Sequence, residues 1–186
     1  MRLASLVFVT SNLGKLEEAS AVLGIRLRHH ALDLPEIQSL DLEEVVRHKA
    51  RAAFERLGAP VLVEDTSLEL AGLGGFPGPL VRWMLSTVGP AGIARVAHAF
   101  ADPRAVARCL ACAVDGAEEV FGPGEVRGVI APSPRGTRGF GWDSVFVPEG
   151  CGGRTYAEMP PAEKNAVSHR RKAFLALRER LEGQAR

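Results

Sequence analysis

Two adjacent carboxylates, Glu64 and Asp65, are the side chains of this chain that are best placed to do chemistry. They follow the apolar, β-branched residues 61–63, which indicate a buried strand. Because side chains alternate along a strand, the two carboxylates face opposite sides, and we expect only one of them in a site. A carboxylate at the end of a buried strand needs a hydrogen bond, a cation or a metal ion. The alternative is a strand end that meets solvent, where the two acids have no chemical role.

The polar turn at residues 10–15 is a candidate anion site, since it joins an expected strand to an expected helix. Ser11 or Asn12 can cap that helix, and Gly14 allows the backbone to approach a ligand closely. Free N–H groups at the start of a helix attract anions, and Lys15 adds a positive charge there. The turn therefore predicts a phosphate cradle, although its spacing is not that of a Walker A loop. The alternative is an ordinary capped helix with a surface lysine.

Lys49 and Arg170 each interrupt an apolar helical stripe. Lys49 lies in the stripe of a helix expected at residues 42–57, where it either extends its ammonium group to solvent or reaches into a site. Arg170 lies in the stripe of the last expected helix, at residues 162–181. A guanidinium group cannot lose its charge, so an inward-facing one needs partners. Both cations are therefore candidates for a site that also contains the carboxylates.

A short aromatic segment, Phe140-Gly141-Trp142-Asp143, follows a loop rich in proline, glycine and arginine. Two aromatic rings around a glycine, with an acid beside them, resemble a platform on which a base can stack. The alternative is a packed aromatic turn, which is common in globular proteins. The segment thus adds a candidate base-binding element to the candidate phosphate-binding turn.

The bulk composition is that of an ordinary globular chain, with 186 residues, 46% hydrophobic residues and a net charge of +1. We expect a single domain over residues 1–186, with two lobes, and no nucleic-acid or membrane partner. The apolar residues 3–9 indicate a first strand rather than a signal peptide. Three cysteines provide no disulfide framework, which suits the cytoplasm, and the lone CxxC pair Cys109 and Cys112 indicates buried structural thiols.

The pattern of apolar residues predicts an α/β protein. Strands are expected at residues 6–9, 26–34, 61–68, 105–114, 118–130 and 145–147, and helices after Lys15 and at residues 42–57, 80–88, 93–100 and 162–181. The long β-rich section between residues 105 and 130 favours a mixed sheet over a purely parallel one. A loop with four glycines and two prolines, at residues 72–79, is neither a dinucleotide fingerprint nor a linker.

Taken together and in order, these motifs resemble the inosine triphosphate pyrophosphatase family over nearly the whole chain. They are FVTSNLGK at 8–15, DLPE at 33–36, VEDT at 63–66, GGFPGP at 74–79, FGWD at 140–143 and AEKNAVSHR at 162–170. Each motif alone is weak, but the ordered set is specific. The chain departs from the family pattern at Ser11, where a glycine is usual, and at Ser144, where a proline is usual. Neither change removes a group with chemistry.

The resemblance implies hydrolysis of inosine, deoxyinosine and xanthosine triphosphates to the monophosphate and pyrophosphate, with Mg²⁺ as the cofactor. This hydrolysis would remove non-canonical nucleotides from the nucleotide pool. It also implies an elongated mixed β-sheet flanked by helices, with two lobes and an active-site cleft between them. Members of the family are usually homodimers, so we expect a homodimer here. Physically, a triphosphate needs cations such as Lys15 and Lys49, and Mg²⁺ prefers oxygen ligands.

The same resemblance implies roles for particular residues. Glu36 and Asp65 are expected to hold the metal ion, and Asp65 and Lys49 are expected to act in catalysis. The expected substrate-binding residues are Thr10, Ser11, Asn12, Leu13, Gly14, Lys15, Thr66, Phe140, Gly141, Trp142, Asp143, Lys164, His169 and Arg170. Within this set Arg170 has only donors, so it fits the 6-carbonyl of inosine better than the 6-amino group of adenosine. The alternative is that Arg170 pairs with an acid such as Asp143.

Two other functions remain open from the sequence. One is a pyrophosphatase for ordinary or modified pyrimidine nucleotides on a similar two-lobed fold, which would show no preference for 6-keto purines. The other is a nucleotide-binding regulator without turnover, against which the presence of Glu36, Lys49 and Asp65 argues. A purely structural protein would leave Lys49 and Arg170 unexplained.

Overall fold

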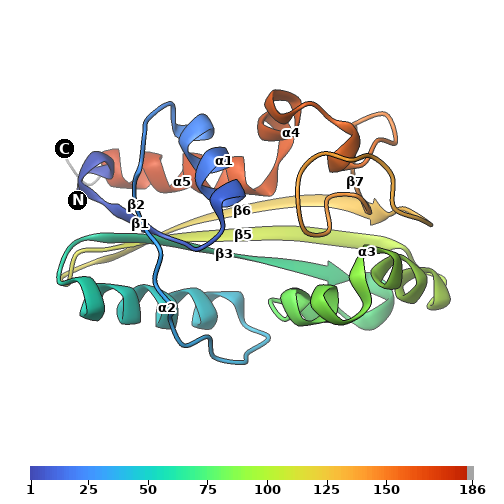
Figure 1. Cartoon of the computed structure of the whole chain (residues 1–186), viewed down its shortest axis with the longest axis horizontal. Coiled ribbons are helices and arrows are strands. Elements are labelled where there is room, and N and C mark those ends of the chain that lie inside the picture. The colour runs from blue at the N-terminus through green and yellow to red at the C-terminus, as the bar shows by residue number, and fades with distance from the viewer. Residues whose placement is uncertain (184–186) are drawn as a thin grey trace.

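The computed structural model describes residues 1–183 and consists of one mixed β-sheet with helices on both faces (Figure 1). The strands are β1 Val7–Val9, β2 Arg28–His30, β3 Val61–Leu70, β4 Pro77–Gly78, β5 Arg104–Val114, β6 Glu119–Ile130 and β7 Phe146–Pro148. The helices are α1 Leu13–Leu23, α2 Leu42–Leu57, α3 Val81–Ala99, α4 Pro161–Val167 and α5 His169–Gly183, with 3-10 helices at Leu3–Ser5, Ala71–Leu73 and Tyr156–Glu158. In Figure 1, α1, α4 and α5 cover one face of the sheet, and α2 and α3 cover the other.

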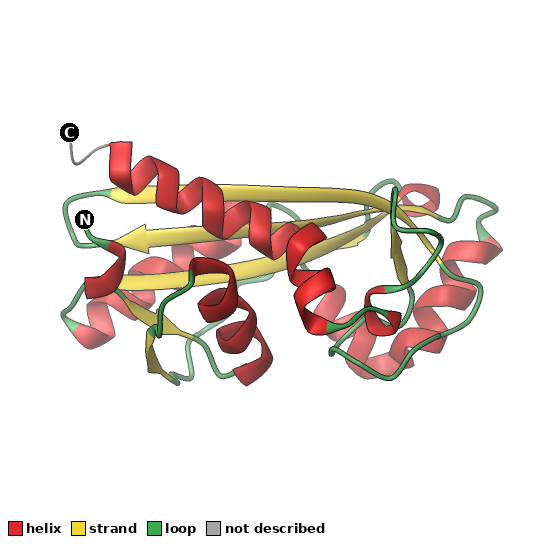
Figure 2. Cartoon of the chain, turned by 90° about the horizontal axis from the view of Figure 1, so that it is seen from above, coloured by secondary structure: helices red, strands yellow, loops and turns green. Residues whose placement is uncertain are grey.

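The sheet has the strand order β2-β1-β3-β5-β6-β7, with β4 paired to β3. β1 pairs in parallel with β2 and β3, whereas the pairs β3–β5, β5–β6 and β6–β7 are antiparallel. The long strands β3, β5 and β6 cross the whole molecule, which gives it the elongated shape seen in Figure 2. The predicted α/β class and elongated mixed sheet are therefore confirmed. The single domain over residues 1–186 stays a prediction.

Two glycines of β6 determine how closely α5 lies on the sheet. A Cβ atom at Gly122 or Gly124 would overlap the backbone of α5, at Ala173 and His169 respectively. Glycine at these positions lets the helix backbone rest directly on the strand. β6 therefore fixes the start of α5, which carries His169 and Arg170.

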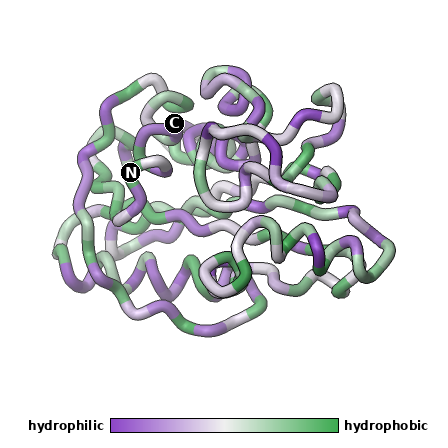
Figure 3. Tube along the Cα trace, turned by 45° about the vertical axis from the view of Figure 1, so that its right-hand side comes forward, coloured by the Kyte–Doolittle hydropathy of each residue, from purple (hydrophilic) through white to green (hydrophobic). Residues whose placement is uncertain are grey.

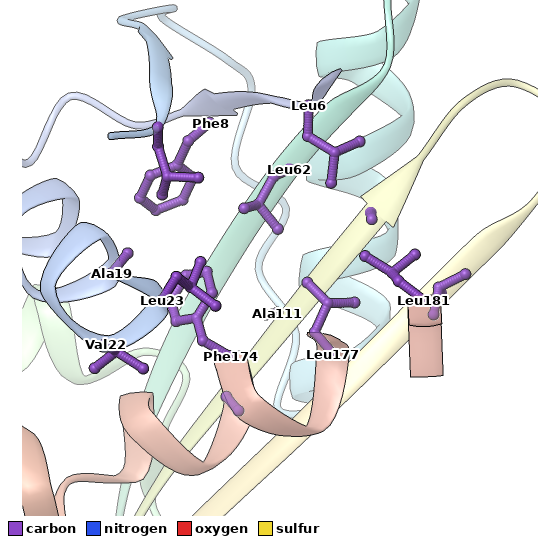
Figure 4. Close-up of a cluster of buried hydrophobic side chains, with 14 of the residues drawn as sticks. Leu6, Phe8, Ala19, Val22, Leu23, Leu62, Ala111, Phe174, Leu177 and Leu181 are labelled. Carbon is purple, nitrogen blue, oxygen red and sulfur yellow. The ribbon is translucent and has the colours of Figure 1, made fainter. Parts of the chain in front are cut away.

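The hydrophobic core lies on both faces of the sheet. Figure 4 shows the part enclosed by α1, α5 and the strands, where the rings of Phe8 and Phe174 meet edge to face at 5.8 Å between centroids. A second cluster packs α2 against the other face, and a third surrounds Trp142, Phe146 and Tyr156 at the far end of the long strands. Hydrophobic and hydrophilic residues alternate along the helices in Figure 3, as expected for amphipathic helices that cover a sheet.

The helix starts follow the capping residues that the sequence offers. Asn12 caps α1, since its side-chain oxygen accepts a hydrogen bond from the Lys15 N–H at 3.1 Å. Asp41 caps α2 by accepting from the N–H groups of Glu43 and Glu44. Both helices therefore begin where local side-chain chemistry satisfies their first N–H groups.

One expected helix and one expected strand differ from the structure, whereas an expected break between two helices is confirmed. The last helix, expected to run unbroken over residues 162–181, is interrupted at Ser168, whose backbone is extended and whose hydroxyl accepts a hydrogen bond from the Arg171 N–H. The expected strand at residues 26–34 is paired only over Arg28–His30. The helices expected at 80–88 and 93–100 form the single span of α3, with the expected break visible as non-helical backbone at Gly89. None of the helices within residues 1–183 has the length and apolar character that a membrane span requires.

Candidate active site

A cavity of about 850 Å³ opens between the β1–α1 turn, α2, the start of α3 and the 140–142 segment. Most of the expected site residues line it, namely Thr10, Ser11, Asn12, Leu13, Lys15, Glu36, Lys49, Asp65, Thr66, Phe140, Gly141 and Trp142. The cavity is therefore the candidate active site, and its size is in the range of small-molecule sites.

The β1–α1 turn presents the N-terminus of α1 to this cavity. The Asn12 N–H donates to the Thr10 hydroxyl at 3.1 Å, which holds the turn in shape. The Thr10 carbonyl lies 2.6 Å from His29 Nε2 on the neighbouring strand β2. The positive end of the helix dipole therefore faces the cavity, with the ammonium group of Lys15 beside it.

Glu64 and Asp65 lie on opposite faces of β3, and of the two only Asp65 lines the cavity. Asp65 Oδ2 lies 3.1 Å from Lys49 Nζ, and Oδ1 accepts the Thr66 N–H at 2.8 Å. Burial opposes the charge of Asp65, but the ammonium groups of Lys15 and Lys49 outweigh it and lower the pKa of the carboxyl. Asp65 is therefore ionised at neutral pH.

Glu64 is buried behind the cavity. Its carboxylate contacts Lys15 Nζ at 2.6 Å, Arg170 Nη2 at 3.4 Å and Cys109 Sγ at 3.2 Å. Although burial opposes the charge, Lys15 and Arg170 lower the pKa of Glu64 well below its usual range. Burial in turn raises the pKa of the Cys109 thiol, so this cysteine stays protonated. Lys15 thus connects the two faces of β3, since its ammonium group also lies 3.8 Å from Asp65 Oδ1.

Glu36 and Asp65 approach the same point in the cavity. Lys49 Nζ lies 3.6 Å from Glu36 Oε1 and 3.1 Å from Asp65 Oδ2, so one cation already lies between the two carboxylates. Carboxylate oxygens are the ligands that Mg²⁺ prefers, and this pair fits such an ion if phosphate and water complete its shell. Among residues 1–183, His, Cys, Asp and Glu form no group of three or more that could hold a metal ion by itself.

Acidic and basic side chains alternate from the cavity into the core, and we call this series the charge chain. In order it consists of Arg82, Glu36, Lys49, Asp65, Lys15, Glu64, Arg170, Glu18, Lys164 and Asp143. The residues from Arg82 to Lys15 line the cavity and form its cavity half. The residues from Glu64 to Asp143 do not line the cavity and form its buried half.

The buried half holds the cations that were expected to surround the base. Arg170 pairs with Glu18 and Glu64, and these acids raise its pKa despite burial. Lys164 pairs with Asp143 and with Glu18, the latter at 2.6 Å. Arg170 therefore pairs with acids, as the alternative expected, although the partners are Glu18 and Glu64 and not Asp143, which lies at the other end of the buried half.

Two aromatic rings separate the buried half from the cavity. The centroid of the Phe140 ring lies 4.7 Å from Lys164 Nζ and 5.6 Å from Arg170 Cζ. Trp142 stacks on His169, with ring centroids 5.3 Å apart. The structure thus brings Phe140, Gly141 and Trp142 into the cavity wall, and places Asp143, Lys164, His169 and Arg170 behind it.

Gly14 and His169 both pack against the aromatic rings of the 140–142 segment. A Cβ atom on Gly14 would lie 2.7 Å from the Phe140 ring, so glycine makes room for that ring rather than lining the cavity. Both ring nitrogens of His169 are buried without a hydrogen-bond partner, and burial lowers the pKa of this histidine well below its usual value. His169 is therefore neutral in the folded protein.

The site residues that were not expected from the sequence include Arg82, Trp83 and Glu18. Arg82 donates to Glu36 at 2.6 Å from the start of α3, and Trp83 also lines the cavity. Glu18 joins the two buried cations. Glu18 follows Lys15 by three residues, so the helical spacing would have placed both on one face of α1. Arg82 and Trp83 gave no such signal.

A model of the Ham1 family matches residues 6–180. This chain belongs to the Ham1 family. The chain is 45% identical over 183 residues to a protein of Tuber melanosporum named inosine triphosphate pyrophosphatase, with 96% of this chain and 97% of the relative covered.

Two solved structures also resemble this one. The HAM1 protein of Coxiella burnetii has a TM-score of 0.79 at 28% identity, with 96% of this chain and 99% of the other covered. A Mycobacterium abscessus structure titled nucleoside-triphosphatase / dITP/XTP pyrophosphatase has a TM-score of 0.68 at 33% identity, with 92% and 97% covered. The family match and these structures agree on the fold.

Proposed function

We propose that this protein hydrolyses inosine triphosphate, and with it deoxyinosine and xanthosine triphosphates, to the monophosphate and pyrophosphate. The observation that carries the proposal is the convergence of Glu36, Lys49, Asp65 and Lys15 on one cavity. The names of the relatives support the substrate class, since they include inosine triphosphate pyrophosphatase and dITP/XTP pyrophosphatase.

The triphosphate binds in this proposal at the N-terminus of α1. Lys15 and Lys49 supply positive charge, and the N–H groups of the β1–α1 turn supply donors to phosphate oxygens. Each lysine exchanges a carboxylate partner for a phosphate oxygen, which is feasible because these side chains still contact the cavity.

Glu36 and Asp65 would hold Mg²⁺ beside the phosphates. The ion would neutralise charge on the phosphates and lower the pKa of a bound water. The metal ion would replace Lys49 as the cation shared by Glu36 and Asp65. The lysine would then be free to contact phosphate.

Asp65 is the proposed base for the attacking water. Water oxygen bonds to the α-phosphorus, the bond from this phosphorus to the bridging oxygen breaks, and pyrophosphate leaves. The proton goes to Asp65 Oδ2, which is available once Lys49 has moved to a phosphate oxygen, whereas Oδ1 accepts the Thr66 N–H. Before metal and substrate bind, Lys49, 3.1 Å from Oδ2, keeps the carboxylate ionised and in place.

The base lies in this proposal against Phe140 and Trp142, which form the aromatic wall of the cavity. Arg170 and His169 would then select a 6-carbonyl over a 6-amino group. Arg170 Nε and both His169 ring nitrogens are buried without partners, so polar atoms for such a contact are present. Contact requires the Phe140 ring to leave its place over Arg170.

A homodimer is proposed as well, as the resemblance implies. It is supported by exposed apolar side chains beside the cavity, including Phe76, Trp83 and Val88. They border a second hollow of about 610 Å³ that shares Leu80 and Trp83 with the cavity. Light scattering at micromolar concentration should give twice the 19.9 kDa chain mass, and a mass near 19.9 kDa would contradict the dimer.

A cytoplasmic location is supported by three free cysteines.

A nucleotide panel tests the proposed function. The protein is incubated with Mg²⁺ and inosine, xanthosine, adenosine, guanosine or pyrimidine triphosphates, and pyrophosphate and orthophosphate are assayed separately. We expect pyrophosphate with the inosine and xanthosine nucleotides and little with the others. Equal turnover of pyrimidine nucleotides would favour the pyrimidine pyrophosphatase, and binding without any product would favour the regulator.

A further inference from the structure

Glu18 is the residue that joins the two buried cations. Its Oε1 lies 2.6 Å from Lys164 Nζ, and its Oε2 accepts a hydrogen bond from Arg170 Nη1. Lys164 belongs to α4 and Arg170 to α5, on either side of the break at Ser168. One carboxylate from α1 therefore spans the break and holds both helices.

Three bases of this region, Lys15, Arg170 and Lys164, face the three acids Glu64, Glu18 and Asp143, so loss of the Glu18 charge leaves one positive charge in excess. Lys164 has Asp143 as its other partner, and Arg170 has Glu64. The side chains of Lys164 and Arg170 are only 4% and 3% exposed, so water screens them little. Without the central carboxylate, two buried like charges would repel across the space that it occupies. The distance between the cations therefore depends on Glu18.

The positions of the two cations are passed on to the cavity wall. Phe140 lies over both of them, and its ring also packs against Gly14 of α1. Lys164 pairs with Asp143, whose Oδ2 also accepts the Phe140 N–H at 2.8 Å and so shapes the aromatic segment. A shift of the cations would thus move the ring that borders the proposed base site.

We propose that Glu18 is a positioning residue that sets the preference for 6-keto over 6-amino purines by fixing Lys164 and Arg170 behind Phe140. The inference rests on the proposed function. Glu18 does not line the cavity and is given no contact with substrate. It acts through the cations, which place the aromatic wall and the donors that a 6-carbonyl would use.

The test compares Glu18→Gln with Glu17→Gln. Glutamine keeps the shape of Glu18 and removes its charge, while Glu17 is the exposed neighbour on the same helix. The ratio of kcat/KM for inosine triphosphate to kcat/KM for ATP is measured for each variant and for the unaltered protein. We expect Glu18→Gln to lower this ratio roughly 10- to 100-fold, the range of a charge-assisted hydrogen bond. Glu17→Gln should leave it unchanged.

Other outcomes overturn the inference. If Glu18→Gln lowers both kcat/KM values by one factor, together with the melting temperature, Glu18 is only structural. If this variant does not fold, Glu18→Asp is used, which keeps the charge but cannot reach both cations. It should lower the ratio by a smaller factor, and an unchanged ratio would refute the role. If the unaltered protein releases no pyrophosphate from inosine triphosphate, both this inference and the proposed function fail. If Glu18→Gln keeps the wild-type preference for inosine triphosphate over ATP, this inference fails and the proposed function stands.

Discussion

The two halves of the charge chain contain the same kinds of side chain in different surroundings. In the cavity half, the side chains of Lys49, Asp65 and Glu36 are 15%, 19% and 32% exposed. In the buried half, those of Glu64 and Arg170 are 1% and 3% exposed. Both halves pair every acid with a base, so pairing does not distinguish them. They differ in whether their side chains have access to the cavity.

This difference in access decides which ion pairs can exchange partners during binding and catalysis and which hold the surrounding structure. An ion pair that faces a cavity can exchange its partner for a phosphate or a metal ion, because its charged groups can be reached from the cavity. A buried pair has no such exchange, and removing one partner leaves an uncompensated charge. We therefore propose that the cavity half binds phosphate and metal and carries out the chemistry, whereas the buried half holds the aromatic wall in place and supplies the proposed contact to the base.

Removal of divalent metal should have the largest effect. With excess chelator, we expect pyrophosphate release from inosine triphosphate to stop, because Glu36 and Asp65 would then repel the substrate. The fold should be unaffected, since the cavity half already has internal cation partners. Activity assays and circular dichroism in the same buffer measure both effects. Undiminished turnover in chelator would show that the two carboxylates hold no essential metal.

Asp65→Asn should lower kcat by at least about 10²–10⁴-fold, because it removes the proposed base and one charge of the metal site. Its melting temperature should change little. Glu64→Gln is the matched variant on the other face of β3, and it should lower activity less but reduce stability more, because Glu64 is buried against Lys15 and Arg170. Equal activity losses in the two variants would remove the distinction between the halves.

Arg170→Ala should destabilise the fold by about 3–5 kcal/mol, because Glu18 and Glu64 would lose a buried partner. Arg171→Ala, at the half-buried neighbour on α5, should cost much less. Urea denaturation of both variants gives the comparison. If Arg170 also contacts the 6-carbonyl, turnover of inosine triphosphate should fall steeply in Arg170→Ala while the low turnover of ATP changes little. Similar stability of the two variants would show that the buried ion pairs of Arg170 do not stabilise the fold.

The smallest expected effect is a pH dependence of stability due to His169. Its pKa is lowered in the folded state, so the unfolded chain binds more protons below about pH 6.5. Stability is therefore full above this pH and is lost as the pH falls. Between pH 7.5 and 5.5 the free energy of unfolding should drop by about 1 kcal/mol.

Two histidine variants isolate this effect. His169→Gln should flatten the dependence in this pH range, whereas His48→Gln, at an exposed position, should not. Urea titrations at several pH values measure the slope. A slope that survives in His169→Gln would assign it to other groups.

Local patterns predicted the parts of the site that local chemistry forms. Alternation along β3 placed Glu64 and Asp65 on opposite faces, and the polar turn predicted that Asn12 or Ser11 would cap α1. Lys49 stood out because it interrupts an apolar stripe, and it does contact the cavity. Each of these inferences needs only residues within one element.

The remaining parts depend on contacts between distant elements. Glu18 pairs with Arg170 across 152 positions of the chain, and no local pattern predicts such a partner. The break at Ser168 was missed because the apolar spacing continues through it. The expected base contacts of Lys164 and Arg170 did not anticipate the Phe140 ring, which covers both cations from another segment.

Hydrolysis in ¹⁸O-labelled water tests the central claim most directly. We propose that water attacks the α-phosphorus, beside Asp65 in the cavity half. Mass spectrometry of the products from inosine triphosphate and Mg²⁺ should find the label in inosine monophosphate and none in pyrophosphate. Label in pyrophosphate, or stepwise release of orthophosphate with a diphosphate intermediate, would contradict it.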